Sequence, residues 1–390
     1  MQYIHTDHLG GTNAVTDENG TDFQRSSWLS LAEIEVYSHI CYYGAMAVSK
    51  KRLLTTSNED RGESTGSPRR SEDGAGRRPR LLTGLQPSGA LHIGNYFGAL
   101  KPFVDRHVEF DSFLIIVDYH ALTSLKNAQE LRENIWNVAL DYLGAGLDPQ
   151  HATLFKQSDI PQHTELAWIF ECLVSVPFLM QAHAYKDKIS KGLEANAGLF
   201  NYPMLMAADI LLYDADFVPV GKDQQQHIEY AREAAFKFNN AFGETFKEPQ
   251  GIFIEGVATV PGIDGQKMSK SYKNTIPLFG TRDDISKAVM SIVTDSSKGI
   301  PTNVFEIHKL FRSETDLTSI YESKKGNYKE LKELLIEDIE SLVAPMRLRR
   351  QQYAEQPDVV KNILQEGGER ARAVSEDKMK NVRDRIGVTI

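Results

Sequence analysis

From Pro79 onward, short apolar runs alternate with amphipathic stretches, and this alternation restricts the fold more than any other feature of the chain. The runs are RLLTGLQ (80–86), DSFLIIVDY (111–119), ATLFKQ (152–157) and DFVPV (216–220). Segment 127–143 has helical periodicity, and we expect its helix to end at Gly144. Strands that alternate with helices form a parallel sheet with right-handed crossovers. The sequence therefore predicts an α/β domain with a Rossmann-like parallel sheet over residues 79–280.

The C-terminal part of the chain has a different pattern. Strand signals end near Thr281, and helical patterns, including residues 328–342, continue to Ile390. We therefore expect an α-helical second domain over residues 281–390.

The N-terminal part differs again. Residues 50–79 are polar, charged and rich in Gly and Ser, a composition typical of disordered segments. Residues 1–20 resemble a fragment of an Rhs-type YD repeat, and a single repeat cannot form a core of its own. We therefore expect residues 1–78 to be a disordered extension or an artefact of the gene start, and we assign no function to them.

Composition excludes several classes of protein. The chain has 390 residues, and 41% of them are hydrophobic, as in an ordinary globular protein. No apolar stretch approaches the roughly 20 residues of a membrane-spanning helix, and there is no signal peptide. The two cysteines, Cys41 and Cys172, are too few for a disulfide framework or a four-cysteine zinc site. We therefore expect a cytoplasmic protein with no membrane partner.

The turn after the first apolar run is suited to binding a nucleotide. Its sequence is TGLQPSGALHIGNYFGAL (83–100), and a turn from the first strand into a helix is where an α/β sheet binds nucleotides. Glycines allow backbone N–H groups to approach a phosphate closely. His92 and Asn95 lie at the start of the helix, where their side chains can donate to a phosphate oxygen. On this motif alone, a tight turn with a packed histidine is an equally good interpretation.

A second motif, KMSKS, spans residues 267–271. It places Lys267 and Lys270 three residues apart in a loop that also contains glycine and small hydroxyl residues. Such a loop can close two ammonium groups over a triphosphate. Most lysine pairs form only a solvated basic turn, but here the string is complete and follows a strand-like run, FIEGVATV (253–260).

Together, the two motifs resemble the HIGH and KMSKS signatures of the class I aminoacyl-tRNA synthetases. His92-Ile93-Gly94-Asn95 agrees with the first signature at three positions, and residues 267–271 agree with the second at all five. Within this class the tryptophanyl branch is most similar. It shares G-x-QPSG-x-x-x-IGNY-x-GA, VDxHA (117–121), MAADILLY (206–213) and VPVGxDQxQH (218–227). The resemblance covers residues 80–390, and the Asn in the first signature is usual in this branch.

The resemblance implies adenylation, in which the carboxylate of L-tryptophan attacks the α-phosphorus of ATP and pyrophosphate leaves. A carboxylate is already ionised at neutral pH, so the site needs no general base and instead aligns the reactants and stabilises charge. Mg²⁺ is expected to bridge the phosphates with few protein ligands, and we predict no metal site made by the protein alone.

The same resemblance implies which residues act in adenylation. The expected catalytic residues are His92, Lys188, Lys267 and Lys270. Lys188 could equally be a solvated lysine beside Lys186 and Lys191. The residues expected to bind ATP are Gln86, Pro87, Ser88, Gly94, Asn95, Gly221, Lys222, Asp223, Val260, Lys267, Met268, Ser269, Lys270 and Ser271. Asp223 is expected to accept from a ribose hydroxyl, and the backbone near Val260 to touch the adenine.

Selection of tryptophan requires an acceptor, because an indole N–H only donates. Asp209 lies among apolar residues in YPMLMAADILLY, and a buried carboxylate without a partner is costly, so we expect it to await that donor. An Asp bonded to backbone or to an arginine is the alternative. The expected walls of the pocket are His120, Tyr202, Met206, Val218, Val220 and Gln224. His120 could equally be a packed core residue.

Transfer of the amino acid to tRNA(Trp) requires local positive charge, even though the net charge is −9. Candidate contacts in the helical segment are Arg347, Arg349, Arg350, Arg370, Arg372, Lys378, Lys380, Arg383 and Arg385. About half of these could instead be solvated residues with i,i+4 partners, such as Glu366 with Arg370. The resemblance implies a homodimer whose helical domain reads the anticodon and whose tRNA spans both subunits, with attack by the 2′-hydroxyl.

Four other interpretations remain open on the sequence. A tyrosyl-tRNA synthetase has the same signatures but needs a pocket for a hydroxyl group that both donates and accepts. Other nucleotidylyltransferases commonly lack a complete KMSKS loop and a long helical appendix. A non-catalytic RNA-binding relative should have lost lysines or glycines from the signatures, and none is missing here. A surface protein, suggested by the Rhs-like start, should carry an export signal.

Overall fold

The computed structural model describes residues 3–6, 12–16, 77–192, 194–220, 225–253, 260–294 and 300–390. The chain divides into two compact units, Met1–Tyr37 and Ser38–Ile390. In the first unit, β1 (Tyr3–Thr6) and β2 (Thr12–Thr16) form an antiparallel pair. Of residues 1–78, which were expected to be disordered or an artefact of the gene start, the structure describes only this strand pair and residues 77 and 78; the rest lies outside the described residues.

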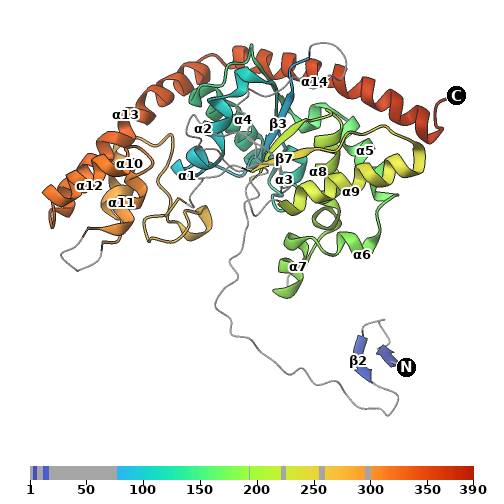
Figure 1. Cartoon of the computed structure of the whole chain (residues 1–390), viewed down its shortest axis with the longest axis horizontal. Coiled ribbons are helices and arrows are strands. Elements are labelled where there is room, and N and C mark those ends of the chain that lie inside the picture. The colour runs from blue at the N-terminus through green and yellow to red at the C-terminus, as the bar shows by residue number, and fades with distance from the viewer. Residues whose placement is uncertain are drawn as a thin grey trace, which may run out of the picture. The chain divides into compact units, whose positions relative to one another are not determined.

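The second unit is built on a five-stranded sheet in the order β5-β4-β3-β6-β7 (Figure 1). The strands are β3 (Arg80–Leu85), β4 (Asp111–Ile116), β5 (Ala152–Lys156), β6 (Phe217–Val220) and β7 (Gln250–Phe253). Every neighbouring pair is parallel. The strand order reverses between β3 and β6, which is the point where open α/β sheets bind ligands. The predicted Rossmann-like fold is confirmed.

Helices cover both faces of this sheet, because side chains of successive strand residues point to opposite sides. Leu82, Phe113 and Ile115 join a core with three helices, α5 (Gln162–Glu171), α8 (Ala197–Leu211) and α9 (Gln225–Phe242). Leu114 and Ile116 join a second core with α4 (Ala128–Ala145) and α2 (Lys101–Val104). Both faces of the sheet are therefore covered by buried apolar side chains, which leaves the ends of the strands as the place where a ligand could reach the sheet.

Two element boundaries differ from the prediction. The second strand ends at Ile116, and the short helix α3 (Asp118–Ala121) begins where the strand was expected to continue. Helix α4 continues past Gly144 and ends at Gly146, which has a left-handed φ of 108°. Gly144 is instead a contact point, since a Cβ there would lie 2.7 Å from Cβ of Arg350. The predicted end at Gly144 was therefore wrong because this glycine serves helix packing rather than helix termination.

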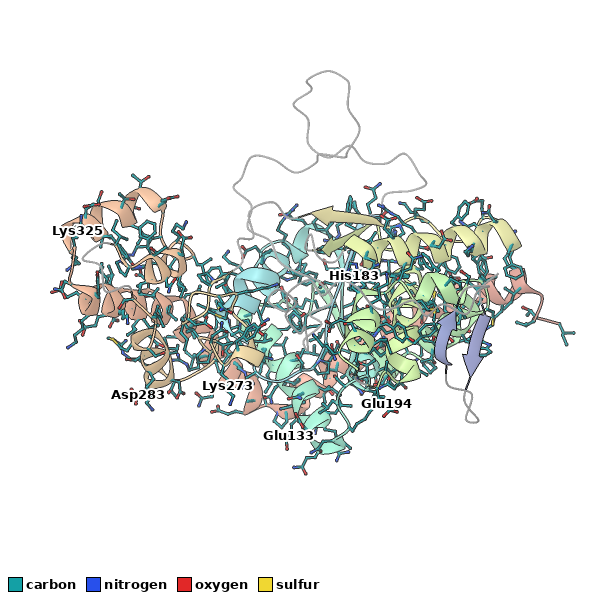
Figure 2. The ribbon with its side chains drawn as sticks, turned by 90° about the horizontal axis from the view of Figure 1, so that it is seen from below. Glu133, His183, Glu194, Lys273, Asp283 and Lys325 are labelled. Carbon is teal, nitrogen blue, oxygen red and sulfur yellow. The ribbon has the colours of Figure 1, made fainter. Side chains whose placement is uncertain are left out.

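The C-terminal segment is helical, as predicted. It contains α10 (Arg282–Met290), α11 (Thr302–His308), α12 (Glu314–Ser323), α13 (Tyr328–Ala354) and α14 (Pro357–Ile386). Helix α13 is longer than the predicted 328–342 and passes through Pro345. Figure 2 shows Lys325 and Asp283 of this segment at one end of the view, with His183 and Glu194 towards the other and Lys273 between them.

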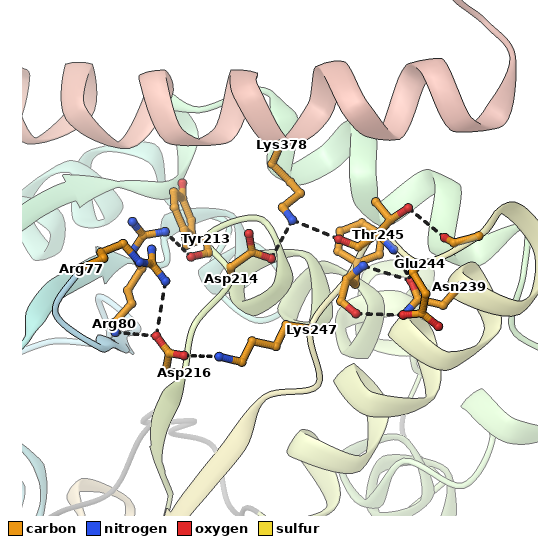
Figure 3. Close-up of polar contacts among 12 residues, drawn as sticks. Arg77, Arg80, Tyr213, Asp214, Asp216, Asn239, Glu244, Thr245, Lys247 and Lys378 are labelled. Carbon is orange, nitrogen blue, oxygen red and sulfur yellow. Dashed lines mark hydrogen bonds and ion pairs between the residues drawn. The ribbon is translucent and has the colours of Figure 1, made fainter. Parts of the chain in front are cut away.

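Helix α14 returns to the catalytic sheet instead of staying with the other C-terminal helices (Figure 1). It lies against β5 so closely that a Cβ on Gly367 would be 1.9 Å from the carbonyl oxygen of Leu154. Lys378 of α14 reaches Asp214 at 2.6 Å and the carbonyl of Thr245 at 3.1 Å (Figure 3). The last helix is thus part of the catalytic core, and residues 281–390 do not separate from it cleanly.

Across the parts of the chain that the structure describes, no helix is both long enough and apolar enough to span a membrane.

Candidate active site

The candidate site lies at the carboxyl ends of the parallel strands. His92 follows β3, His120 follows β4, and Gln157 follows β5. The residues after β6 and β7, 221–224 and 254–259, lie outside the described residues. Because the carboxyl ends of parallel strands meet at one edge of a sheet, segments far apart in the sequence are brought together there.

The first signature turn is ordered by its own polar side chains. Gly89 has a φ of 97°, a left-handed conformation that favours glycine. His92 caps the short helix α1 (Ile93–Asn95): its Nδ1 accepts from the Asn95 N–H at 3.2 Å, and Asn95 Oδ1 accepts from the His92 N–H at 3.1 Å. Because Nδ1 accepts, a neutral His92 carries its proton on Nε2. That nitrogen is the donor which contact with a phosphate requires.

Two further features of this turn suit a ligand. Gln86 is buried, and its Oε1 atom has no hydrogen-bond partner among the described residues. Buried polar atoms are normally paired, so an unpaired one points to a missing partner such as a bound substrate. A Cβ on Gly94 would lie 2.9 Å from the ring of His92 and 3.4 Å from Sδ of Met268. Gly94 is thus enclosed between the two signatures, where a side chain would push them apart.

The second signature loop lies directly on the first. Lys270 Nζ donates to the carbonyl oxygens of Ser88 and Gly89, at 3.1 and 3.0 Å. The backbones are also joined, since the Ile93 N–H donates to Ile276 O and the Leu278 N–H donates to Leu91 O, both at 3.0 Å. The structure therefore brings the two signatures together, although 182 residues separate Ser88 from Lys270 in the sequence.

Asn274, which the sequence analysis did not single out, organises the second loop. It is 1% exposed and donates to Asp264 Oδ1 at 2.8 Å and to Lys267 O at 3.0 Å. Its Oδ1 accepts from the Ser269 N–H at 2.7 Å. A Cβ on Gly262 would lie 2.3 Å from Nδ2 of Asn274. The side-chain amide of Asn274 therefore holds the loop together from inside. The sequence offers only one signal for this role, which is that Asn274 follows the motif by three residues.

Asp209, on α8, is fully buried but already has partners. Its carboxylate accepts from Gln157 Nε2 at 2.7 Å and from His120 Nε2 at 3.0 Å, and His163 Nδ1 lies 2.6 Å away. The expectation of a partnerless carboxylate was therefore wrong, because three side chains from neighbouring elements face it. The alternative of an arginine partner is not seen among the described residues either.

Burial acts to raise the pKa of Asp209, but hydrogen bonds and charge interactions with His120 and His163 outweigh it and hold the pKa below its ordinary value. Asp209 is therefore an ionised acceptor at neutral pH. Gln157 and His163 were not predicted. Gln157 is the last residue of an apolar strand-like run, a position at the ligand-binding edge, so a signal for it was present; His163 had none.

The other predicted pocket residues surround this carboxylate in part. Tyr202 and Met206 lie on α8 with Asp209, and Val218 lies on β6; all three are buried. The rings of His120 and Tyr202 meet edge to face, with centroids 6.4 Å apart. Tyr202 also exchanges a hydrogen bond with His227 Nε2 at 3.1 Å, and burial raises the pKa of its hydroxyl. Asp209, His120 and Tyr202 are thus linked by successive contacts.

For several predicted site residues, the structure shows no contact, among the residues it describes, with the Asp209 cluster or the first signature turn. Gly221, Lys222, Asp223 and Gln224 lie outside the described residues, as do the side chains of Val220 and Ser271. Val260 is buried beside the second loop, and its carbonyl accepts from the Met268 N–H at 2.8 Å. Lys188 lies on α7 (His183–Ser190), which Figure 1 shows apart from α1, and no hydrogen bond or ion pair of the described residues joins it to either signature.

Most of the basic residues considered for tRNA have intramolecular partners. Arg350 binds Asp141 at 2.6 Å, and Arg347 binds Glu340 at 2.8 Å. Further contacts join Arg349 to Gly144 O, Arg370 to Pro149 O and Ala152 O, Arg372 to Asp159 O, Lys378 to Asp214, and Arg383 to Glu165 and Glu376. Arg370 thus reaches backbone carbonyls of the catalytic unit, rather than the Glu366 that helix spacing suggested. Apart from Arg347, whose partner lies in the same helix, these cations connect α13 and α14 to the sheet and the helices around it.

Comparison with known proteins agrees with this geometry. Residues 75–356 match the family of tRNA synthetases class I (W and Y). A tryptophan–tRNA ligase of Fusobacterium nucleatum is 46% identical over 318 residues, which cover 79% of this chain and 98% of that protein. The crystal structure of tryptophanyl-tRNA synthetase from Campylobacter jejuni, complexed with ADP and tryptophan, is 43% identical with a TM-score of 0.74, over 79% of this chain and 99% of that one. The chain therefore belongs to the tryptophanyl-tRNA synthetases, within class I of the aminoacyl-tRNA synthetases.

Proposed function

We propose that this chain activates tryptophan with ATP and transfers the amino acid to tRNA(Trp), as a tryptophan–tRNA ligase. The observation that carries the proposal is the contact of Lys270 Nζ with the carbonyls of Ser88 and Gly89, which joins the two signatures at the carboxyl edge of the sheet. Both signatures are needed to hold one ATP, and this contact supports their acting together.

In adenylation, the tryptophan carboxylate attacks the α-phosphorus and pyrophosphate leaves. The attacking group is already ionised, so the protein's contribution is alignment and stabilisation of charge. Lys270 can exchange its two carbonyl partners for phosphate oxygens with a small movement of its side chain. Lys267, which is exposed on the same loop, can follow when the loop closes. His92 donates from Nε2 to a phosphate oxygen, with its ring held by the helix cap.

ATP is expected to enter with Mg²⁺ on its phosphates. Among the described residues, no three His, Cys, Asp or Glu side chains are grouped so that they could hold a metal ion. Mg²⁺ would therefore take its ligands mainly from phosphate oxygens and water. Gln86, Pro87, Ser88, Gly94 and Asn95 would hold the nucleotide from the first turn. Further ATP contacts are assigned to Gly221, Lys222, Asp223, Val260 and the loop of Met268, Ser269 and Ser271.

Tryptophan selection is assigned to Asp209, whose ionised carboxylate can accept from the indole N–H. Tyr202, Met206, His120, Val218, Val220 and Gln224 are the proposed walls. A site built to bond a polar group rejects analogues that lack it far more strongly than an apolar cavity does. The proposed pocket can therefore separate tryptophan from phenylalanine without an editing domain.

Transfer to tRNA would use the C-terminal helices to recognise the anticodon, with residues 281–390 as the binding domain. A homodimer and a cytoplasmic location complete the proposal. Lys380 is an exposed cation on α14 and a candidate for contact with the tRNA backbone.

The test is ATP–pyrophosphate exchange measured separately with tryptophan, tyrosine and phenylalanine. Exchange that depends on tryptophan, with tyrosine and phenylalanine at least ~100-fold weaker in kcat/KM, is the expected result. Preference for tyrosine would replace the proposal with a tyrosyl enzyme. A folded protein without exchange for any of the three would indicate a non-catalytic relative.

A further inference from the structure

The buried carboxylate of Asp209 is surrounded unevenly by its donors. Oδ1 accepts from Gln157 Nε2 at 2.7 Å and lies 2.6 Å from His163 Nδ1. Oδ2 accepts from His120 Nε2 at 3.0 Å. A carboxylate oxygen has two lone-pair positions. Two side-chain nitrogens therefore face Oδ1, whereas only one faces Oδ2 among the described residues, so Oδ2 is the less occupied oxygen.

The two side chains that face Oδ1 are each held by a further polar contact. The side-chain oxygen of Gln157, Oε1, accepts from the Tyr119 N–H at 3.1 Å. This contact orients the side-chain amide so that Nε2 faces the Asp209 carboxylate. His163 Nε2 lies 2.8 Å from the Tyr213 hydroxyl. The ring of His163 is thus held between the Asp209 carboxylate on one side and the Tyr213 hydroxyl on the other. Gln157, His163 and Tyr213 are all 0% exposed.

This arrangement meets two requirements of selection. A buried negative charge needs polar partners to offset its lost hydration. The two nitrogens that face Oδ1 serve as such partners without occupying Oδ2. A binding group must also be held in place by its own neighbours. Oδ2 lies on the side of His120, whose ring packs against Tyr202, and both are proposed pocket residues. Oδ2 is thus the carboxylate oxygen nearer to the proposed pocket residues.

We propose that Gln157 and His163 are positioning residues for tryptophan selection, which hold Oδ1 of Asp209 in place and leave an acceptor position on Oδ2 for the indole N–H. Tyr213 supports this role indirectly, because its hydroxyl group holds the ring of His163. This inference rests on the proposed role of Asp209 and deepens it. A carboxylate that could rotate, or one whose Oδ1 lacked donors, would bind the indole less selectively.

The experiment compares kcat/KM in ATP–pyrophosphate exchange for L-tryptophan and for its benzothienyl analogue, in which sulfur replaces the indole N–H. The ratio of the two values reports the hydrogen bond alone, because the two side chains have nearly the same shape. Gln157→Met and His163→Leu should each lower this ratio by at least ~10-fold, mainly through tryptophan, with KM for ATP unchanged. An equal loss for both substrates would overturn the inference, since it would indicate general damage to packing.

Two variants guard against misfolding of the buried site. In His163→Asn, the amide nitrogen replaces Nδ1 as donor, so the ratio should stay within about threefold of wild type. Tyr213→Phe removes only a hydroxyl group and should lower the ratio by a smaller factor, about 3 to 10. Full ratios in both His163→Leu and Tyr213→Phe, with cooperative thermal melting, would contradict the inference. Thr164→Val, on the exposed side of the same helix, is the matched control and should leave the ratio unchanged.

Asp209→Asn distinguishes this inference from the function on which it rests. If Asp209→Asn lowers the ratio but Gln157→Met and His163→Leu do not, the role of Asp209 stands and the positioning role is wrong. If Asp209→Asn itself leaves the ratio unchanged, the proposed role of Asp209 fails, and the inference fails with it.

Discussion

In the proposed function, two charged residues, Asp209 and Lys270, determine where the substrates bind. Asp209 supplies a negative charge in a place without water, and it is tolerated because Gln157, His120 and His163 face it. Lys270 supplies a positive charge at the meeting point of two loops, where it rests on two carbonyls. The acid is held by three side chains, whereas the lysine reaches its carbonyl partners through a long side chain. This difference agrees with selection at one end of the site and catalysis at the other.

Replacing Asp209 by Asn should weaken activation of tryptophan. The amide keeps the shape but presents an N–H group towards donors, so the indole N–H and at least one neighbour lose an acceptor. The expected loss in kcat/KM corresponds to at least ~1–3 kcal/mol. Steady-state exchange kinetics measure it. Unchanged tryptophan kinetics in this variant would remove Asp209 from the pocket.

How far the sequence predicts this site depends on whether a contact is local. The two signatures and Asp209 were identifiable because each stands in a specific string of residues. The partners of Asp209 were not, because Gln157 and His163 come from β5 and α5, and only the fold places them beside α8. For the same reason Asn274 was missed: its role depends on how the loop winds around it.

At the scale of elements, two contacts of the C-terminal helices, α13 with α4 and α14 with β5, could not be predicted from the pattern of the sequence. Periodicity predicted that the C-terminal segment is helical. It did not predict that α14 lies on β5. The only trace of this close contact in the sequence is Gly367, and a single glycine does not identify a partner strand. Gly144 was misread as a helix end for the same reason: a glycine that ends a helix and one that admits a neighbouring chain look alike in sequence.

Gly367→Ala should destabilise the packing of α14. The added methyl group would lie 1.9 Å from the carbonyl oxygen of Leu154, so the helix must shift. The expected loss in the free energy of unfolding is about 1–3 kcal/mol. The control is Gly368→Ala, whose Cβ would meet Asp159 at an ordinary 3.7 Å and should be neutral or slightly stabilising. Equal melting temperatures for the two variants would contradict the close contact.

The ion pair between α4 and α13 should make stability depend on pH. Burial raises the pKa of Asp141 to about 6, although Arg350 acts in the opposite direction. The folded state then binds more protons than the unfolded state between about pH 4 and 6, so this group's contribution to stability falls as pH rises through that window. The fall is at most about 3 kcal/mol.

Chemical denaturation of wild type and Asp141→Asn from pH 4 to 8 isolates this contribution. The wild type should lose stability relative to the variant as pH rises to about 6, and the difference should then become constant. A difference that does not vary with pH would show that the carboxyl titrates normally in the folded protein.

At the scale of the whole molecule, the matched family region begins at residue 75, and the antiparallel pair β1–β2 belongs to a separate compact unit. The sequence predicted a change near residue 79 from its composition, whereas the boundary between the two units lies between Tyr37 and Ser38. The catalytic and helical segments, by contrast, form one unit, because α14 closes on the sheet.

A chain that starts at Arg78 should therefore keep full tryptophan-dependent exchange. The reason is that every contact described at the site lies within residues 77–390. Exchange rate and melting temperature, compared with the full chain, measure the effect. A truncated protein that folds but is inactive would assign a role in catalysis to the N-terminal residues.

The central claim, that the two signature loops act on one ATP, is tested most directly by the single-turnover rate of tryptophanyl-adenylate formation in Lys267→Ala, Lys270→Ala and Lys273→Ala. Lys273 is exposed on the same loop, so it controls for loss of charge. The account predicts that the first two variants lose at least ~100-fold in rate with little change in ATP affinity, because their contacts strengthen in the transition state, while Lys273→Ala stays near wild type. A Lys270→Ala rate equal to that of Lys273→Ala would contradict the account.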